Sequence, residues 1–115
     1  YLIICLNNGI IKKTLIDLFK NKRNNGILAI NINNENIKII GVSIIYTNNL
    51  IILSTLQGKF IKFNENKIKL TQRNSYGVKS IKLQNNDKVI SLDIIKNNEY
   101  ILTITENGYG KKTKE

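Results

Sequence analysis

Apolar and polar positions along the chain fall into short blocks that predict strands joined by tight turns. The clearest block runs from Tyr100 to Thr113: an apolar, β-branched stretch is followed by Asn107-Gly108 and by a second short stretch that ends near paired lysines. Asn-Gly favours a two-residue hairpin turn, because the type I′ geometry needs positive φ at both central residues. We therefore expect a β-hairpin with its turn at Gly108.

The same block occurs twice more upstream. Residues 1–14 and 50–63 each contain an apolar stretch, a turn with glycine and a second stretch that carries lysine, and the turn glycines are Gly9 and Gly58. Together with Gly108 they are spaced by about 50 residues, a period typical of arrays of small β-sheets. The spacing predicts an all-β fold of repeated antiparallel blades, as in a propeller.

The second half of each unit also repeats. Residues 26–32 and 77–83 both begin with glycine, contain apolar positions and are followed by an asparagine-rich turn. Apolar stretches at 37–46 and 89–95 follow these turns, so a second hairpin is expected in each unit. Four antiparallel strands per blade are then predicted, and the repeat units cover about 1–48, 49–98 and an incomplete 99–115.

Both ends of the chain lack the features of a terminal repeat. The chain opens on apolar residues without a methionine, and neither end shows a polar cap. Repeat units bury their apolar faces against their neighbours, and terminal units usually carry a polar outer face. We therefore expect the chain to be a fragment of a longer protein.

Composition adds a strongly basic charge and disfavours several kinds of chemistry. The net charge is +10, from 18 Lys and Arg against 8 Asp and Glu, which favours a polyanionic partner or a solvated surface. Histidine is absent, Cys5 is the single cysteine, and the carboxylates are scattered. A His-dependent triad, an internal disulfide and a metal cluster are therefore not expected. Neither a signal peptide nor a membrane span is indicated.

Lysine recurs at a fixed position in the hairpins. The fourth residue after each turn glycine is Lys13, Lys62 or Lys112, and Lys12 and Lys111 precede two of them. Because alternate strand residues face opposite sides, a repeated position places like charges at the same place on successive blades. One interpretation is a regular basic rim suited to phosphate contacts, which position a nucleic acid without recognising its sequence. The alternative is that these are ordinary solvated strand ends in a lysine-rich chain.

A second group of basic residues lies in and after the linkers between the hairpins. Its members are Lys22, Arg23, Arg73, Lys79 and Lys82. Such linkers are expected on the outer surface, where the basic side chains could either contact phosphates or simply be solvated. With the hairpin lysines, these residues make up the basic set that could contact phosphates.

Several segments, in order along the chain, resemble the C-terminal domain of the DNA gyrase A subunit. They are Gly9–Thr14, Ile39–Val42, Arg73–Leu83 and Thr103–Thr113. The resemblance covers essentially the whole chain. It implies that residues 1–115 are part of one C-terminal β-pinwheel, a propeller-like domain of antiparallel four-stranded blades.

The resemblance also implies a function. The family's domain wraps duplex DNA around a basic rim, which supports ATP-dependent negative supercoiling by a type II topoisomerase. The implied partners are double-stranded DNA, the B subunit of gyrase and a second A subunit. ATP and Mg are implied as cofactors elsewhere in that complex. In the chain itself we expect no catalytic residue, no metal site and no cofactor.

Two alternatives stay open. The family's Gln-Arg-Arg-Gly-Gly-Lys-Gly box does not occur in this sequence, so the C-terminal domain of the topoisomerase IV A subunit is one of them. The other is a protein-binding β-propeller whose lysines reflect A+T-biased coding, and DNA affinity with a steep salt dependence would argue against it. The implied location is the bacterial cytoplasm, with a plastid-type organelle as the alternative.

Overall fold

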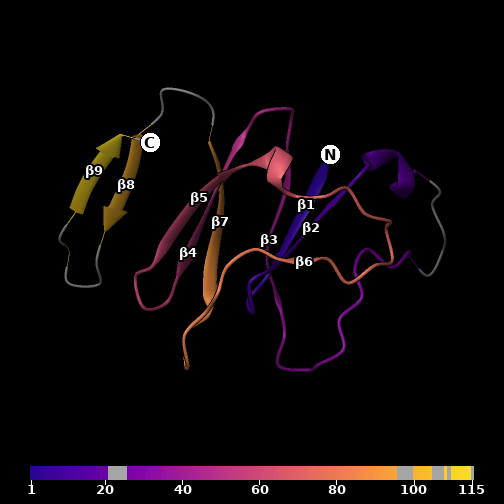
Figure 1. The fold of residues 1–115 in the computed structure, drawn as a ribbon, viewed down its shortest axis with the longest axis horizontal. Coiled ribbons are helices and arrows are strands. Elements are labelled where there is room, and N and C mark those ends of the chain that lie inside the picture. Colours follow the sequence, from indigo (N-terminus) through magenta and orange to yellow (C-terminus); the bar gives the residue numbers. More distant parts are fainter. Residues whose placement is uncertain (21–25, 96–99, 105–107, 109, 115) are drawn as a thin grey trace.

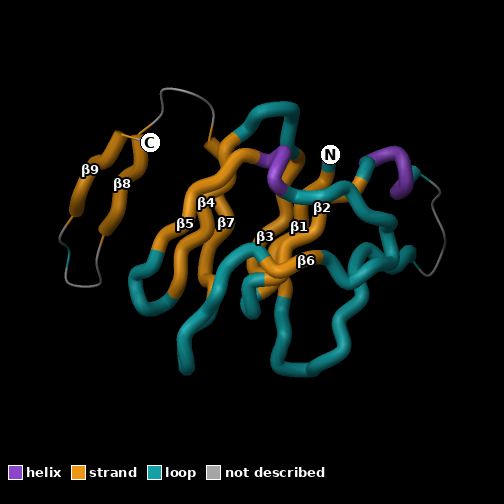
Figure 2. The backbone as a smooth tube through the Cα atoms, viewed as in Figure 1, coloured by secondary structure: helices purple, strands orange, loops and turns teal. Residues whose placement is uncertain are grey.

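The computed structural model describes residues 1–20, 26–95, 100–104, 108 and 110–114. Over these residues it consists of β-strands, connecting loops and two short 3-10 helices (Figures 1 and 2). The strands form a four-stranded, a three-stranded and a two-stranded sheet, in which neighbouring strands are antiparallel. The predicted all-β fold of antiparallel blades is confirmed. No helix in the described part of the chain is long and apolar enough to cross a membrane.

The first blade is the four-stranded sheet, with the order β3–β1–β2–β6. Strands β1 (Leu2–Leu6) and β2 (Ile10–Thr14) form a hairpin, and its turn residue Gly9 has a φ of 88°. Strand β3 (Ile39–Ile44) pairs with β1, whereas β6 (Val78–Lys79) pairs with β2. The fourth strand of this blade therefore comes from the second repeat unit.

The second blade is the three-stranded sheet, with β4 (Leu50–Thr55) between β5 (Phe60–Asn64) and β7 (Val89–Ile95). Its hairpin turns at Gly58, where φ is 89°. The third sheet is the hairpin of β8 (Tyr100–Ile104) and β9 (Gly110–Lys114), and Gly108 between these strands has a φ of 88°. The turns predicted at the three repeated glycines are thus confirmed.

Cross-strand register places the hairpin lysines at one equivalent position. The pairs across the three hairpins are Ile3 with Lys13, Ile52 with Lys62, and Leu102 with Lys112. The predicted geometric equivalence of these lysines in their hairpins is therefore confirmed at the level of the backbone. What surrounds each lysine is a separate question, since it depends on residues from outside the hairpin.

The strand predicted within residues 26–32 is wrong, because this segment forms a loop. Its backbone bonds to the linker of the second unit instead of to a neighbouring strand: the Asn31 amide donates to the Ser75 carbonyl over 3.1 Å. Ile30 is buried with Ile4 and Leu6 against the first blade. The apolar residues that suggested a strand thus cover a sheet face. The strand predicted over 77–83 is likewise reduced to the two residues of β6.

Two short helical turns follow the hairpins. Helix η1 (Ile16–Phe19) comes after β2, and η2 (Glu65–Lys67) comes directly after β5. The Asn64 side chain accepts a hydrogen bond from the Asn66 amide and so caps η2. This turn directs the chain from the second blade toward the first blade.

The first two blades pack face to face around one apolar core. Ile3 and Ile11 of the first blade and Ile51 and Leu53 of the second are fully buried in it. The two blades come close together at Gly41 of β3, where an added Cβ would be 2.7 Å from the Cβ of Leu92 in β7. Only glycine permits this spacing of the two sheets.

Candidate nucleic-acid interface

Lys13 extends from β2 into the space between the first two blades. Its ammonium lies 2.9 Å from the Glu65 Oε2 atom and donates to the Glu65 carbonyl over 3.2 Å. It also lies 4.9 Å from the centroid of the Tyr1 ring. Lys13 and Glu65 are 7% and 3% exposed, so this is a buried ion pair that joins the first repeat unit to the second.

The Glu65 carboxylate is held in its charged form by its neighbours. Burial alone would raise its pKa, but hydrogen bonds from the Lys13 ammonium and the Asn48 amide lower the pKa below its ordinary value. Glu65 is therefore ionised at neutral pH. Its Oε2 atom accepts from the Lys13 ammonium and its Oε1 atom from the Asn48 amide, which precedes β4.

Lys12 extends to the opposite face of the first blade, as expected for the next residue of a strand. Its ammonium donates to the carbonyls of Ala29 over 2.9 Å and Ser75 over 3.1 Å, and also to the Arg73 carbonyl. The residue is 1% exposed. Burial, and to a smaller extent the Arg73 guanidinium, lowers the pKa of this ammonium to about 8.

The predicted basic rim is therefore wrong at Lys12 and Lys13, because neither ammonium reaches the surface. Strand alternation places the two side chains on opposite faces of β2, as expected. However, residues of the second unit cover both faces: η2 lies over Lys13, and the 73–75 linker lies over Lys12. These two lysines bind protein groups and are not available to phosphates.

The other predicted residues have different surroundings. Lys62, Lys79 and Lys82 are exposed, whereas Arg73 is half-buried and its Nη1 atom donates to the Leu28 carbonyl over 2.6 Å. Lys22 and Arg23 lie outside the described residues. Lys111 and Lys112 lie on β9, for which the structure describes the backbone. Of the predicted set, three lysines are thus shown to be available at the surface.

Exposed lysines gather around the hairpin turns of the first two blades. We call this region the turn surface, and its members are Lys38, Lys59, Lys79, Lys82 and Lys88. In Figure 1 the β1–β2 turn, the β4–β5 turn and the loops that precede β3 and β7 all lie at the lower side of the view. The lysines come from these turns and loops and from the β6 region beside the first turn.

Hydrogen bonds hold the loops of the turn surface together. Asn7 connects two of them, since its amide donates to the Lys38 carbonyl and its carbonyl accepts from the Val89 amide, both over 2.9 Å. The Leu56 amide donates to the Lys88 carbonyl over 2.9 Å. The Lys59 ammonium donates to the Lys82 carbonyl over 3.2 Å. The lysines therefore stand on a connected framework.

Acidic groups offset only part of this positive charge. The same loops carry the carboxylates Glu35 and Asp87, and the Asp87 Oδ1 atom accepts hydrogen bonds from the amides of Gln57 and Lys88 over 3.1 and 2.9 Å. Exposed asparagines 33, 34, 36, 85 and 86 add neutral donors beside the lysines. Ammonium and amide donors at a surface suit phosphate oxygens, which they bind without distinguishing bases.

Sequence reasoning missed Lys38, Lys59 and Lys88. A usable signal was present, because each lies within two residues of an Asn-, Asp- or Gly-containing turn. Repeat position alone singled out the lysines inside the strands, and those are the positions that a neighbouring unit can cover. Lysines beside turns stay at the surface, since turns seldom pack under another element.

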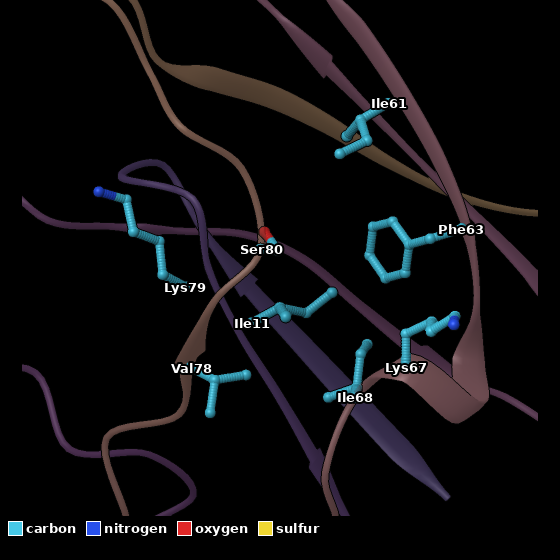
Figure 3. Close-up of a pocket in the computed structure, with 8 residues that line it drawn as sticks. All are labelled: Ile11, Ile61, Phe63, Lys67, Ile68, Val78, Lys79 and Ser80. Carbon is cyan, nitrogen blue, oxygen red and sulfur yellow. The ribbon is translucent and has the colours of Figure 1, made fainter.

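A small cavity of about 210 Å³ lies between the first two blades, near β6 and η2 (Figure 3). Its walls are mainly apolar and include Ile11, Phe63 and Val78. Figure 3 shows Lys67 and Lys79 at its edges, with their nitrogen atoms directed away from the apolar side chains. Within the described residues no group of three or more His, Cys, Asp or Glu side chains could hold a metal ion. The turn surface is therefore the better candidate site.

Antiparallel blades built on a repeated hairpin define a propeller-type β domain, and the comparisons identify which one. Residues 1–45, 49–96 and 99–115 match the model of the family described as the DNA gyrase C-terminal domain, β-propeller. The match covers nearly the whole chain. The chain belongs to this family.

Relatives that are DNA gyrase A subunits occur in bacteria and in an archaeon. The chain is 44% identical to the A subunit of Buchnera aphidicola subsp. Baizongia pistaciae, over 94% of this chain and 13% of the relative. It is 39% identical to that of Salmonella typhimurium, over 92% and 12%, and 37% identical to that of Haloquadratum walsbyi, over 98% and 13%. The chain thus spans about an eighth of the length of these curated relatives.

Solved structures of similar domains agree with the family. The C-terminal domain of DNA topoisomerase IV superposes with a TM-score of 0.87 at 27% identity, covering 97% of this chain and 35% of that one. A DNA gyrase A C-terminal domain superposes with a TM-score of 0.82 at 28% identity, covering 97% and 36%. The chain is therefore similar to about a third of such a domain.

Proposed function

We propose that this chain is a DNA-binding part of a gyrase A C-terminal domain and that duplex DNA lies against the turn surface. The observation that carries the proposal is the gathering of five exposed lysines on hydrogen-bonded loops at one end of two blades. The hairpin lysines Lys12 and Lys13, in contrast, are occupied inside the protein. Family membership supplies the kind of partner.

The mechanism is electrostatic. Each ammonium group that replaces a counterion at a phosphate releases that counterion, and this release favours binding most strongly at low salt. Lysines on several loops contact phosphates at different points along a duplex, which favours a bent path when the protein surface is curved. The base sequence should affect the affinity only through the stiffness of the DNA.

In the protein at its natural length, we propose that this binding supports ATP-dependent negative supercoiling. The proposed partners are the B subunit of gyrase and a second A subunit. ATP and Mg would act in other parts of that complex, and the proposed location is the bacterial cytoplasm. Topoisomerase IV is the second candidate, favoured by the TM-score of 0.87 to its C-terminal domain, whereas the curated relatives at 37–44% identity favour gyrase.

The experiment compares two sets of three substitutions in the protein at its natural length. Lys59→Gln, Lys82→Gln and Lys88→Gln neutralise the turn surface. The control set, Lys62→Gln, Lys67→Gln and Lys69→Gln, removes the same charge from exposed positions elsewhere. Affinity for a fluorescent duplex is measured by anisotropy over a range of salt concentrations.

The turn-surface set should flatten the plot of log affinity against log salt by up to about 2.7, which is about 0.9 for each lost phosphate contact. The control set should leave the slope unchanged. A flatter slope for the control set alone would place the DNA on the β5 side. An unchanged slope for both sets would favour the protein-binding propeller instead.

A further inference from the structure

The buried lysine of the first blade has an apolar counterpart in the second. Register places Lys12 opposite Ile4 and Ile61 opposite Leu53, which are equivalent positions of the two hairpins. Ile61 packs against the apolar core, as an inward-facing strand residue normally does. Burying an ammonium costs free energy unless it is hydrogen-bonded. The buried Lys12 ammonium therefore requires hydrogen-bond acceptors at this position of the first blade.

Those contacts join two segments that are far apart in the sequence. The Lys12 ammonium bonds the Ala29 carbonyl on one side and the Arg73 and Ser75 carbonyls on the other. Arg73 closes the arrangement by donating to the Leu28 carbonyl over 2.6 Å. We call Lys12, Arg73 and the four carbonyls they bind the linker clasp. It fastens the linker of the second unit to a loop of the first.

Strand β6 begins only a few residues after the clasp. Gly77 leads into it with a φ of 90°, and an added Cβ would lie 2.9 Å from the Ile11 carbonyl oxygen and 3.2 Å from the Lys12 Cβ. The chain thus passes in close contact with the backbone of β2. Strand β6 pairs with β2 through only two residues, so its own ladder contributes little to holding it.

The segment after β6 reaches the turn surface. The Ser80 amide donates to the Gly9 carbonyl over 2.9 Å, and the Ser80 hydroxyl donates to the same oxygen. Lys79 precedes this anchor and Lys82 follows it, and both are exposed. The clasp, β6 and the anchor therefore form one continuous path from a buried ammonium to two surface ammonium groups.

We propose that Lys12 is a positioning residue for DNA binding: by fastening the 73–75 linker it holds β6 on the first blade and so places Lys79 and Lys82 on the turn surface. The proposal rests on the proposed function. Lys12 itself contacts no DNA. It acts through the path of the chain, and its loss should disorder the two surface lysines while the core between the blades stays packed.

The test is a double-substitution cycle in the protein at its natural length. Lys12→Met keeps most of the length of the side chain and removes the ammonium, and it is combined with Lys79→Gln/Lys82→Gln. Lys12→Met alone should flatten the salt plot by up to about 1.8, as the two glutamines do. In the background of the two glutamines it should add almost nothing. Equal losses in both backgrounds, or an unchanged slope, would overturn the positioning role.

A charge-neutral variant keeps the proposal testable if Lys12→Met fails to fold. Gly77→Ala should displace β6 without removing any charge, because of the positive φ and the contact with the Ile11 carbonyl. The matched control is Gly26→Ala, whose φ is 75° and whose added Cβ would meet nothing within 4 Å. Only Gly77→Ala should flatten the salt slope. The same slope for both alanine variants would contradict the proposal.

Hydrogen exchange separates this proposal from the proposed function. In Lys12→Met the Ser80 amide should exchange faster, while the Thr55 amide, bonded to the Lys59 carbonyl over 2.9 Å, should not change. If Lys79→Gln/Lys82→Gln leaves the salt slope unchanged, these lysines do not bind DNA, and the proposed positioning role of Lys12 in DNA binding is also wrong. If that pair flattens the slope and Lys12→Met does not, only the positioning role is wrong.

Discussion

The first and second blades are built on the same hairpin but place its repeated lysine in opposite environments. Turn geometry and register agree, with φ values of 88° and 89° at the turn glycines and equivalent cross-strand partners for Lys13 and Lys62. Yet Lys13 is buried against Glu65, whereas Lys62 is exposed. The backbone of a hairpin is thus determined locally, and the environment of its side chains is not.

Among the described residues, the difference follows from which segments cover each hairpin. The second unit supplies β6, the linker over Lys12 and the glutamate beside Lys13, so each of these contacts joins residues of different units. On the second blade, β5 pairs only with β4 among the described residues. The function of a repeated residue therefore has to be judged from the neighbouring unit as well as from its own hairpin.

The largest effect is expected from breaking the ion pair between the units. Glu65→Gln leaves the buried Lys13 ammonium without its counter-charge and should lower the free energy of unfolding by roughly 3–5 kcal/mol. Lys62→Gln, at the equivalent exposed position, should change it by less than about 0.5 kcal/mol. Urea unfolding of both variants measures the contrast.

The double variant Lys13→Met/Glu65→Gln sharpens this comparison. It removes both charges, so it should be more stable than Glu65→Gln alone. If Glu65→Gln and Lys62→Gln had equal effects, the buried ion pair would not distinguish the two blades.

A smaller contrast is expected at the turn glycines. Alanine at either position meets the cost of positive φ, about 1–2 kcal/mol. At Gly9 the added Cβ would also lie 2.9 Å from the Ile81 Cγ2 atom and 3.1 Å from the Ile81 carbonyl oxygen, whereas at Gly58 it would meet nothing within 4 Å. Gly9→Ala should therefore cost about 1–3 kcal/mol more than Gly58→Ala. Equal melting curves for Gly9→Ala and Gly58→Ala would show that residues 80–83 do not restrict the space at the first turn.

A further contrast is a pH dependence in the alkaline range that comes from Lys12 of the first blade. The pKa of Lys12 is about 8 in the folded chain and 10.5 in the absence of the fold, so between these values the unfolded chain holds one more proton. The contribution of Lys12 to stability should then rise with pH, by at most about 1.4 kcal/mol per unit, and it levels off outside this window.

Comparison of the wild type with Lys12→Met isolates the contribution of Lys12 to the pH dependence of stability, because the other lysines titrate in both proteins. The difference in unfolding free energy between wild type and variant should grow in favour of the wild type from pH 8 to pH 10. A difference that stays flat over this range would mean that burial does not perturb the Lys12 ammonium.

Local patterns predicted a large part of the fold. The turns at Gly9, Gly58 and Gly108 and the equivalence of the hairpin lysines follow from Asn, Gly and β-branched residues within a few positions of one another. The pairing of β6, which comes from the second repeat unit, with the first blade could not be predicted in this way. Its pairing with β2 depends on packing between units, and an isolated two-residue strand has no periodicity to detect.

The site was harder to predict for the same reason. The contacts that bury Lys12 and Lys13 join residues separated by 63 and 52 positions, which no local pattern reveals. The turn surface, in turn, gathers lysines from loops that the fold brings together through Asn7 and Gly9. The position of a lysine beside a turn predicts that it is exposed, but it does not show which turns lie next to one another in the fold.

Lysine acetylation with and without duplex DNA, followed by mass spectrometry, tests the central claim most directly. In the free protein Lys12 and Lys13 should react slowly, and the exposed lysines should react fast. DNA should protect the turn surface, at Lys38, Lys59, Lys79, Lys82 and Lys88, and should leave Lys62, Lys67 and Lys69 as reactive as before. Fast reaction of Lys12 and Lys13, or protection of Lys62 while the turn surface stays reactive, would contradict the account.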